Sequence, residues 1–89
     1  MDGVLDASAR FDVAVIYNGL ERKIAVARSE LVRVLREQAL RVFGITQNQH
    51  TFGLFTERGA ELPEDKTIEQ AAIRPHERLL LRPRVIQGG

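Results

Sequence analysis

The sequence predicts an α+β fold in which a mixed sheet of four to five strands wraps around one main helix. Three observations lead to this fold class. Residues 11–28 hold two alternating apolar and polar runs separated by an Asn-Gly dipeptide. Residues 29–43 carry apolar residues at helical spacing, and two further β-prone runs follow at 51–56 and 78–82. The strands and the helix must bury their apolar faces against each other, which gives a two-layer domain.

Length and composition bound the class of protein. The chain has 89 residues, of which 44% are hydrophobic and 28% charged, which is typical of one globular domain. It has no cysteine, so disulfides, thiolate metal sites and thiol nucleophiles are excluded. No apolar run approaches the roughly 20 residues that cross a bilayer, and no secretion signal is visible. With a net charge of +1, we expect a monomeric cytoplasmic protein with neither nucleic-acid nor membrane partners.

The opening segment predicts a β-hairpin. Apolar residues alternate along the first strand at Phe11, Val13, Val15 and Tyr17. Asn18-Gly19 is the dipeptide that most readily adopts the positive φ angles of a tight hairpin turn. Ile24 and Val26 continue the alternation, so they indicate a second strand that returns beside the first.

One main helix is predicted to follow the hairpin. Ser29 is its expected N-cap, with Glu30 in the first turn, where a carboxylate favours the helix dipole. The expected buried stripe consists of Leu31, Leu35, Ala39 and Val42, widened by Val32 and Phe43. Leu40 falls on the opposite, polar side and does not fit the stripe. Gly44 is a natural residue to end the helix.

The second half completes the domain. A third strand is expected at 51–56, Thr67 is expected to cap a short helical turn that ends before Pro75, and 78–82 form the last strand. The last strand must find a partner inside the sheet, so the arrangement is a β-grasp. We divide the chain into a flexible N-terminal tail (1–10), the β-grasp domain (11–83) and an extended C-terminal tail (84–89).

From Gly59 onward the string GAELPEDKTIEQAAIRPHERLLLRPR aligns without a gap with the corresponding part of ubiquitin. Identities include Gly59, Leu62, Thr67, Ile73, Leu79, Leu81 and Arg84. The hairpin, the helix and Gly44 follow in the same order upstream, so residues 11–89 resemble the ubiquitin family. This resemblance implies a prokaryotic protein modifier with a C-terminal diglycine. Similar proteins are encoded beside E1-like, E2-like and deubiquitinase-like enzymes in bacterial operons, some implicated in phage defence.

The terminal Gly88-Gly89 is the expected acyl-donor site. Two residues without a Cβ can thread a narrow channel in an extended conformation. A carboxylate is a poor acyl donor until it is adenylated, after which a partner cysteine can take the acyl group as a thioester. We therefore expect Gly89 to react as a substrate, with no catalytic group and no bound cofactor on this chain. The activating E1-like enzyme would use the ATP, and an E2-like enzyme, a deubiquitinase-like protease and a target protein would be the other partners.

The resemblance also implies where partners would recognise the chain. Arg84 matches the tail arginine that ubiquitin-activating enzymes sense, so we expect a carboxylate partner for it. The exposed isoleucine and valine of ubiquitin's apolar patch correspond to Thr56 and Arg82, so that patch is largely lost. A substitute surface is expected from the apolar residues Leu20, Phe55 (or its neighbour Leu54) and the outward-facing Leu80, with Arg82 beside them.

Self-modification would have few acceptors. The two best-known ubiquitin linkage positions correspond to Ala60 and Pro75, which leaves Lys23, Lys66 and the α-amine. The two histidines have no cysteine partners and lie on different elements, so no metal site is expected. Two other functions share the fold: a sulfur carrier that forms a C-terminal thiocarboxylate, and a non-covalent interaction domain in which the glycines are incidental.

Overall fold

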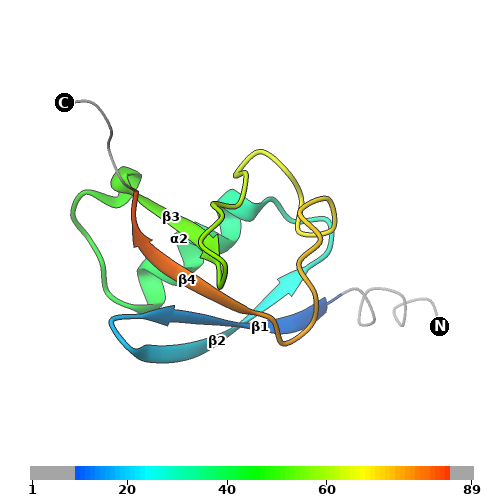
Figure 1. The fold of residues 1–89 in the computed structure, drawn as a ribbon, viewed down its shortest axis with the longest axis horizontal. Helices are drawn as coiled ribbons and strands as arrows, with labels where there is room; N and C mark the ends of the chain where they lie inside the picture. Colours follow the sequence, from blue (N-terminus) through cyan, green and yellow to red (C-terminus); the bar gives the residue numbers. More distant parts are fainter. Residues whose placement is uncertain (1–9, 85–89) are drawn as a thin grey trace.

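The computed structural model describes residues 10–84, which form a four-stranded mixed sheet packed against one helix (Figure 1). The elements in chain order are β1 (Arg10–Tyr17), β2 (Leu20–Ala27), α2 (Val32–Val42), the 3-10 turn η1 (Gln49–Thr51), β3 (Phe52–Thr56) and β4 (Arg78–Pro83). The strand order is β2-β1-β4-β3, with β1 parallel to β4 and the other neighbours antiparallel. The predicted α+β β-grasp class is therefore confirmed. β1 begins at Arg10, one residue before the predicted boundary of the domain.

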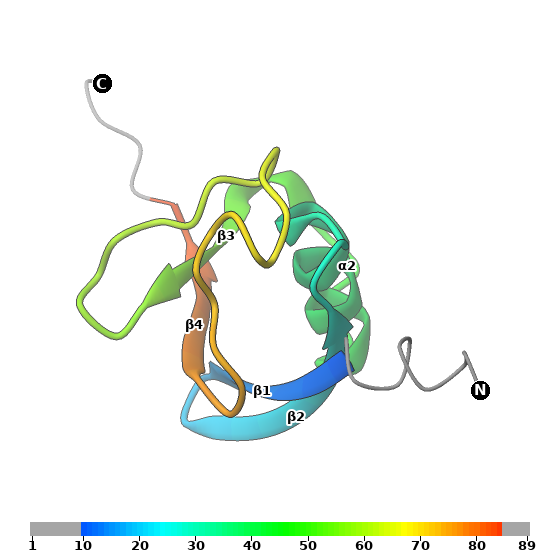
Figure 2. The same cartoon turned by 90° about the vertical axis from the view of Figure 1, so that its right-hand side faces the viewer.

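The sheet curves around α2, which lies on its concave side (Figure 2). The hairpin has the predicted two-residue turn: Asn18 and Gly19 have φ angles of 53° and 80°, and Tyr17 pairs with Leu20. Positive φ at both central residues gives the turn a twist that matches the flanking strands. Among residues 10–84, no helix is long and apolar enough to cross a bilayer.

The start of α2 differs from the prediction. The helix begins at Val32 rather than after Ser29, and its N-cap, Leu31, makes no side-chain cap hydrogen bond. Instead, the Val32 and Arg33 amides donate to the carbonyls of Lys66 and Glu64, at 2.8 and 3.2 Å. The free amides of the first turn are thus satisfied by a loop distant in sequence, which removes the need for a capping side chain.

The buried face of α2 also differs from the predicted stripe. Leu40, which the sequence placed on the polar side, is 1% exposed, whereas Val42 is 49% exposed. The buried helix residues are Val32, Leu35, Arg36, Ala39 and Leu40. This set has the i, i+3, i+4, i+7, i+8 spacing of a helix face that packs on a sheet. The core-facing stripe is therefore rotated relative to the predicted one.

The helix ends as predicted at Gly44, which has a φ of 71°. The Gly44 amide donates to the Arg41 carbonyl and the Ile45 amide donates to the Leu40 carbonyl, at 3.1 and 2.9 Å. This pair of hydrogen bonds is the Schellman motif, which satisfies carbonyls at a helix C-terminus. It directs the chain away from α2 toward η1 and β3.

The predicted cap at Thr67 is present, although the segment that follows is a turn rather than a helix. The Gln70 amide donates to Thr67 Oγ1 at 3.0 Å, and the Thr67 amide donates to Gln70 Oε1 at 2.9 Å. This reciprocal pair is a capping box. It orders the loop that carries the Glu64 and Lys66 carbonyls to the start of α2.

Candidate functional site

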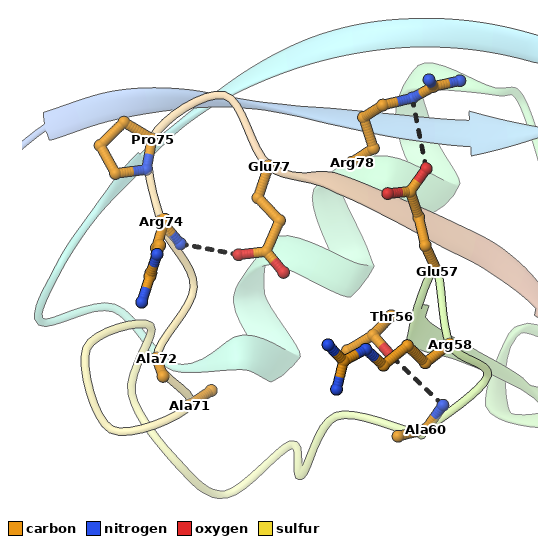
Figure 3. A pocket seen from close by; sticks show the side chains of 10 residues that line it. All are labelled: Thr56, Glu57, Arg58, Ala60, Ala71, Ala72, Arg74, Pro75, Glu77 and Arg78. Atoms are coloured by element: carbon orange, nitrogen blue, oxygen red, sulfur yellow. Dashed lines mark hydrogen bonds and ion pairs between the residues drawn. The ribbon is translucent and has the colours of Figure 1, made fainter.

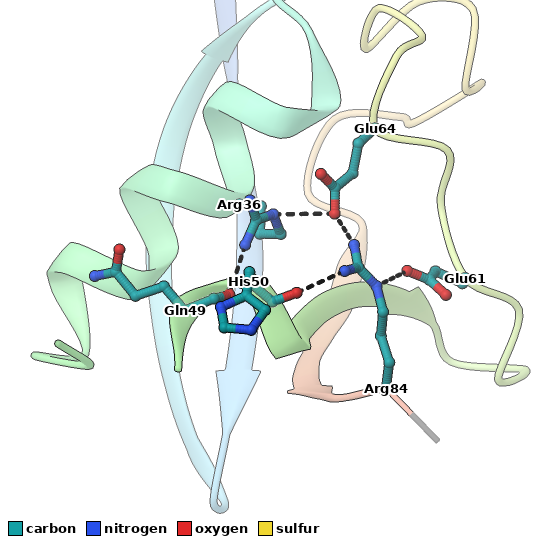
Figure 4. A network of polar contacts seen from close by, with 6 residues as sticks. All are labelled: Arg36, Gln49, His50, Glu61, Glu64 and Arg84. Carbon is teal, nitrogen blue, oxygen red and sulfur yellow. Dashed lines mark hydrogen bonds and ion pairs between the residues drawn. The ribbon is translucent and has the colours of Figure 1, made fainter. Parts of the chain in front are cut away.

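The end of β4, from which the C-terminal segment continues, is fixed by contacts to Arg84 (Figure 4). The Arg84 amide donates to the Thr51 carbonyl at 2.7 Å. Its guanidinium donates through Nε to Glu61 Oε2 at 2.5 Å and through Nη1 to the His50 carbonyl at 2.8 Å. Nη2 pairs with a carboxylate oxygen of Glu64. We call Arg84, Glu61 and Glu64 the Arg84 clamp.

Gly53 in β3 makes room for the clamp. A Cβ at this position would lie 2.7 Å from Glu61 Oε2 and 3.1 Å from Arg84 Nε. Both distances are shorter than ordinary van der Waals contact, so any other residue would require the Glu61 carboxylate and the Arg84 guanidinium to shift. Gly53 is not among the residues with positive φ, so its backbone conformation does not require glycine. The requirement comes from the close approach of the Glu61–Arg84 pair.

Arg36 connects the clamp to α2. It is buried, and its Nη1 donates to the Gln49 carbonyl at 2.8 Å. Its Nε lies 3.0 Å from Glu64 Oε2, a distance that makes an ion pair, although the orientation is not that of a hydrogen bond. The pKa of the Arg36 guanidinium is lowered, mainly because the group is buried and to a smaller extent because Arg84 repels it. Glu64 therefore lies between two cations and ties the helix, the loop and the end of β4 together.

The outer face of the sheet carries Arg82, Phe55 and Leu80. The Arg82 guanidinium carbon lies 4.4 Å from the centre of the Phe55 ring, within cation–π distance. Phe55 is only 8% exposed. Phe55 therefore lies on the outer face, as expected, but its ring is largely covered because the Arg82 guanidinium lies over it. Leu80 is half-buried, in register between Ile16 of β1 and Phe55 of β3.

Leu20 is 52% exposed, but it does not join that face. It pairs with Tyr17, whose ring packs against Phe43 and Phe52 on the helix side of the sheet. Ile16 and Leu80 lie on the opposite side, because side chains alternate between faces along a strand. The structure therefore does not bring the predicted substitute patch of Leu20, Phe55 and Leu80 together on one surface.

A depression of about 710 Å³ lies between the 57–60 turn and residues 71–78 (Figure 3). Its two carboxylates already have partners. Glu57 Oε2 lies 3.7 Å from Arg78 Nε, and Glu77 Oε1 accepts a hydrogen bond from the Arg74 amide at 2.9 Å. Among residues 10–84, no group of three or more His, Cys, Asp and Glu side chains could hold a metal ion.

The predicted conjugation residues are divided between the described and undescribed parts of the chain. Lys23 and Lys66, the predicted internal acceptors, are both exposed. Gly88 and Gly89, the predicted acyl donors, lie outside the described residues, as do most of the predicted tails at 1–10 and 84–89. Their role remains a prediction from the sequence.

Sequence reasoning did not find the acidic half of the clamp. It assigned no role to Glu61, Glu64, Gly53 or Arg36. One pattern pointed to Arg36: it falls between Leu35, Ala39 and Leu40 on what is the buried face of α2. A cation on a buried helix face requires a carboxylate or carbonyl partner. The identity of that partner depends on loop placement, which the pattern does not contain.

The fold belongs to the ubiquitin-like class of β-grasp structures, since the chain superposes over most of its length on solved ubiquitin and ubiquitin-like domains. A designed protein based on ubiquitin superposes with a TM-score of 0.75 at 20% identity, covering 91% of this chain and 96% of the other. Ubiquitin from Caldiarchaeum subterraneum superposes with a TM-score of 0.72 at 17% identity, covering 89% of this chain and 99% of the other. The ubiquitin-like domain of an Arabidopsis thaliana protein superposes with a TM-score of 0.71 at 18% identity, covering 90% of this chain and 83% of the other.

No protein-family model and no curated protein sequence matches the chain. At 17–20% identity, the similarity to solved structures defines the fold, and function must be argued from the residues.

Proposed function

We propose that this chain is a ubiquitin-like protein modifier that is joined to a target through Gly89. The observation that carries the proposal is the Gly88-Gly89 pair, which follows the last strand of a ubiquitin-like fold by a few residues. Five residues of sequence follow Arg84 and can span at most about 17 Å. An enzyme that acts on Gly89 would therefore have to bind close to the Arg84 clamp.

The proposed chemistry uses this chain only as a substrate. An E1-like enzyme would join the Gly89 carboxylate to AMP from ATP, with release of pyrophosphate. A cysteine thiolate of the enzyme would then displace AMP and form a thioester, which an E2-like enzyme would accept. Attack by an amine of the target protein would form the amide and release the thiol, and a deubiquitinase-like protease would reverse it. We place this pathway in a bacterial cytoplasm, in a conjugation operon of the antiphage type.

The experiment compares an N-terminally tagged wild-type chain with Gly88→Ala plus Gly89→Ala in the native host. Gly3→Ala is the matched control, because it makes the same chemical change at the other end of the chain. Tagged adducts of higher mass, seen with wild type and Gly3→Ala but not with the double variant, would support the modifier. Substitution of Lys23 and Lys66 by Arg then distinguishes self-conjugates from target conjugates.

Two outcomes would contradict the modifier. If the free chain shows the mass change of one oxygen replaced by sulfur, and no adducts form, it is a sulfur carrier. If the Gly88→Ala plus Gly89→Ala variant retains the full biological effect that the wild-type chain has in the host, the chain is a non-covalent interaction domain.

A further inference from the structure

We propose that the Arg84 clamp withholds the Arg84 side chain from any partner that recognises a free arginine, and thereby protects the segment that carries the terminal glycines. The inference is independent of the proposed function, because it concerns contacts within residues 10–84 and applies whether or not Gly89 is conjugated.

The clamp engages the guanidinium through all three of its nitrogens. Nε and Nη2 each meet a glutamate, while Nη1 donates to a backbone carbonyl. Hydrogen bonds between a guanidinium and carboxylates are charge-assisted and roughly twice as strong as those between neutral groups. A partner that offers a single carboxylate would have to replace two that are already in place, Glu61 and Glu64.

The surroundings are fitted to this contact. Gly53 leaves the space in which Glu61 and Arg84 meet, and Arg36 holds Glu64 from the helix side. Arg82, two residues earlier, lacks such a clamp: it is exposed and lies over the Phe55 ring. The two arginines therefore differ in availability, with the Arg82 side chain exposed and the Arg84 side chain held.

The clamp holds the residue after which a protease specific for basic residues would separate the β-grasp domain from Gly88 and Gly89. Arg84 is the last basic residue of the sequence, and the preceding basic residue, Arg82, is followed by Pro83. Proteases of trypsin specificity insert the arginine guanidinium into a pocket that contains a carboxylate. They must therefore break the clamp before they can cut the Arg84–Val85 bond and release residues 85–89.

Trypsin itself is the probe, with loss of residues 85–89 followed by intact mass against time. The clamp is weakened in two ways: by Glu61→Gln plus Glu64→Gln, which removes its charges, and by Gly53→Ala, which displaces it sterically. Glu57→Gln is the matched control, because it removes a carboxylate whose ion pair, to Arg78, lies elsewhere. Cleavage after the exposed Arg58 provides an internal reference in wild type and in the two clamp variants. Glu57→Gln is compared at the Arg84 site alone, because position 57 adjoins Arg58.

We expect the double variant to lose residues 85–89 about 2 to 30 times faster than wild type, as for the loss of two partly exposed ion pairs. Gly53→Ala should accelerate this loss less, because its Cβ meets only the Glu61–Arg84 pair. Cleavage after Arg58 should change less than twofold, and Glu57→Gln should match wild type. The proposal is overturned if neither clamp variant is cleaved faster after Arg84, or if Glu57→Gln accelerates this cleavage equally. It is also overturned if both sites accelerate together, which would report general unfolding. If the double variant does not fold, Gly53→Ala decides alone.

Discussion

The side chain of Leu40 is predicted to contribute far more to stability than that of Val42, although the periodicity of the sequence suggests the reverse. Leu40 is 1% exposed and belongs to the core cluster, while Val42 is 49% exposed. Truncation of a buried leucine to alanine costs about 2–5 kcal/mol, because transfer energy is lost and a cavity remains. Val42→Ala should change stability by less than about 0.5 kcal/mol, since little area is lost and alanine is the better helix former.

Urea denaturation followed by circular dichroism measures both variants, with the slope of the free energy against urea as a check on two-state unfolding. For a domain of this size each 1 kcal/mol shifts Tm by roughly 4–8 °C. Leu40→Ala should therefore lower Tm by at least about 8 °C. Equal effects of the two substitutions, or a larger effect of Val42→Ala, would contradict the finding that Leu40, and not Val42, lies on the buried face of α2.

Three further predictions, two of them with a control variant, can be measured by the same titration. Gly44→Ala should lower the free energy of unfolding by about 1–2 kcal/mol. The cost comes from the left-handed backbone alone, because a Cβ at position 44 would meet nothing within 4 Å. Gly44→Asn should lower it less, and equal losses for the two variants would contradict a backbone origin. Thr67→Ala should cost about 0.5–2 kcal/mol through loss of the capping box, and an unchanged midpoint would exclude that role. Arg82→Ala should cost about 0.5–1 kcal/mol by uncovering Phe55. Arg78→Ala should cost close to nothing, because its ion pair is exposed; a loss as large as that of Arg82→Ala would contradict the cation–π assignment.

Features that depend on local chemistry could be predicted from the sequence. Asn18-Gly19 specifies a two-residue turn through its backbone preference, and Gly44 ends a helix for the same reason. Thr67 and Gln70 form a capping box within four residues of chain. In each case the partners are close in sequence, so the pattern contains all the information that the geometry requires.

The start and the buried face of α2 could not be predicted, because both depend on distant residues. The first-turn amides take the Glu64 and Lys66 carbonyls as acceptors, so Ser29 is not needed as a cap. The inclusion of Arg36 on the buried face depends on Glu64 and the Gln49 carbonyl, which neutralise and bind its guanidinium. A periodicity analysis counts arginine as polar and rotates the expected stripe away from it.

Arg84 illustrates how the contacts of an aligned residue depend on parts of the chain that the alignment does not describe. The sequence match led us to expect a carboxylate partner on another protein, and the structure supplies two carboxylates from the same chain. Whether an arginine can be recognised depends on what already binds it, and that is fixed here by Glu61, Glu64 and the absence of a side chain at Gly53. An enzyme that binds this tail must either break the clamp or accept Arg84 as it is held. In the second case its recognition would rely on Arg82, which is exposed, and on the residues that follow Arg84.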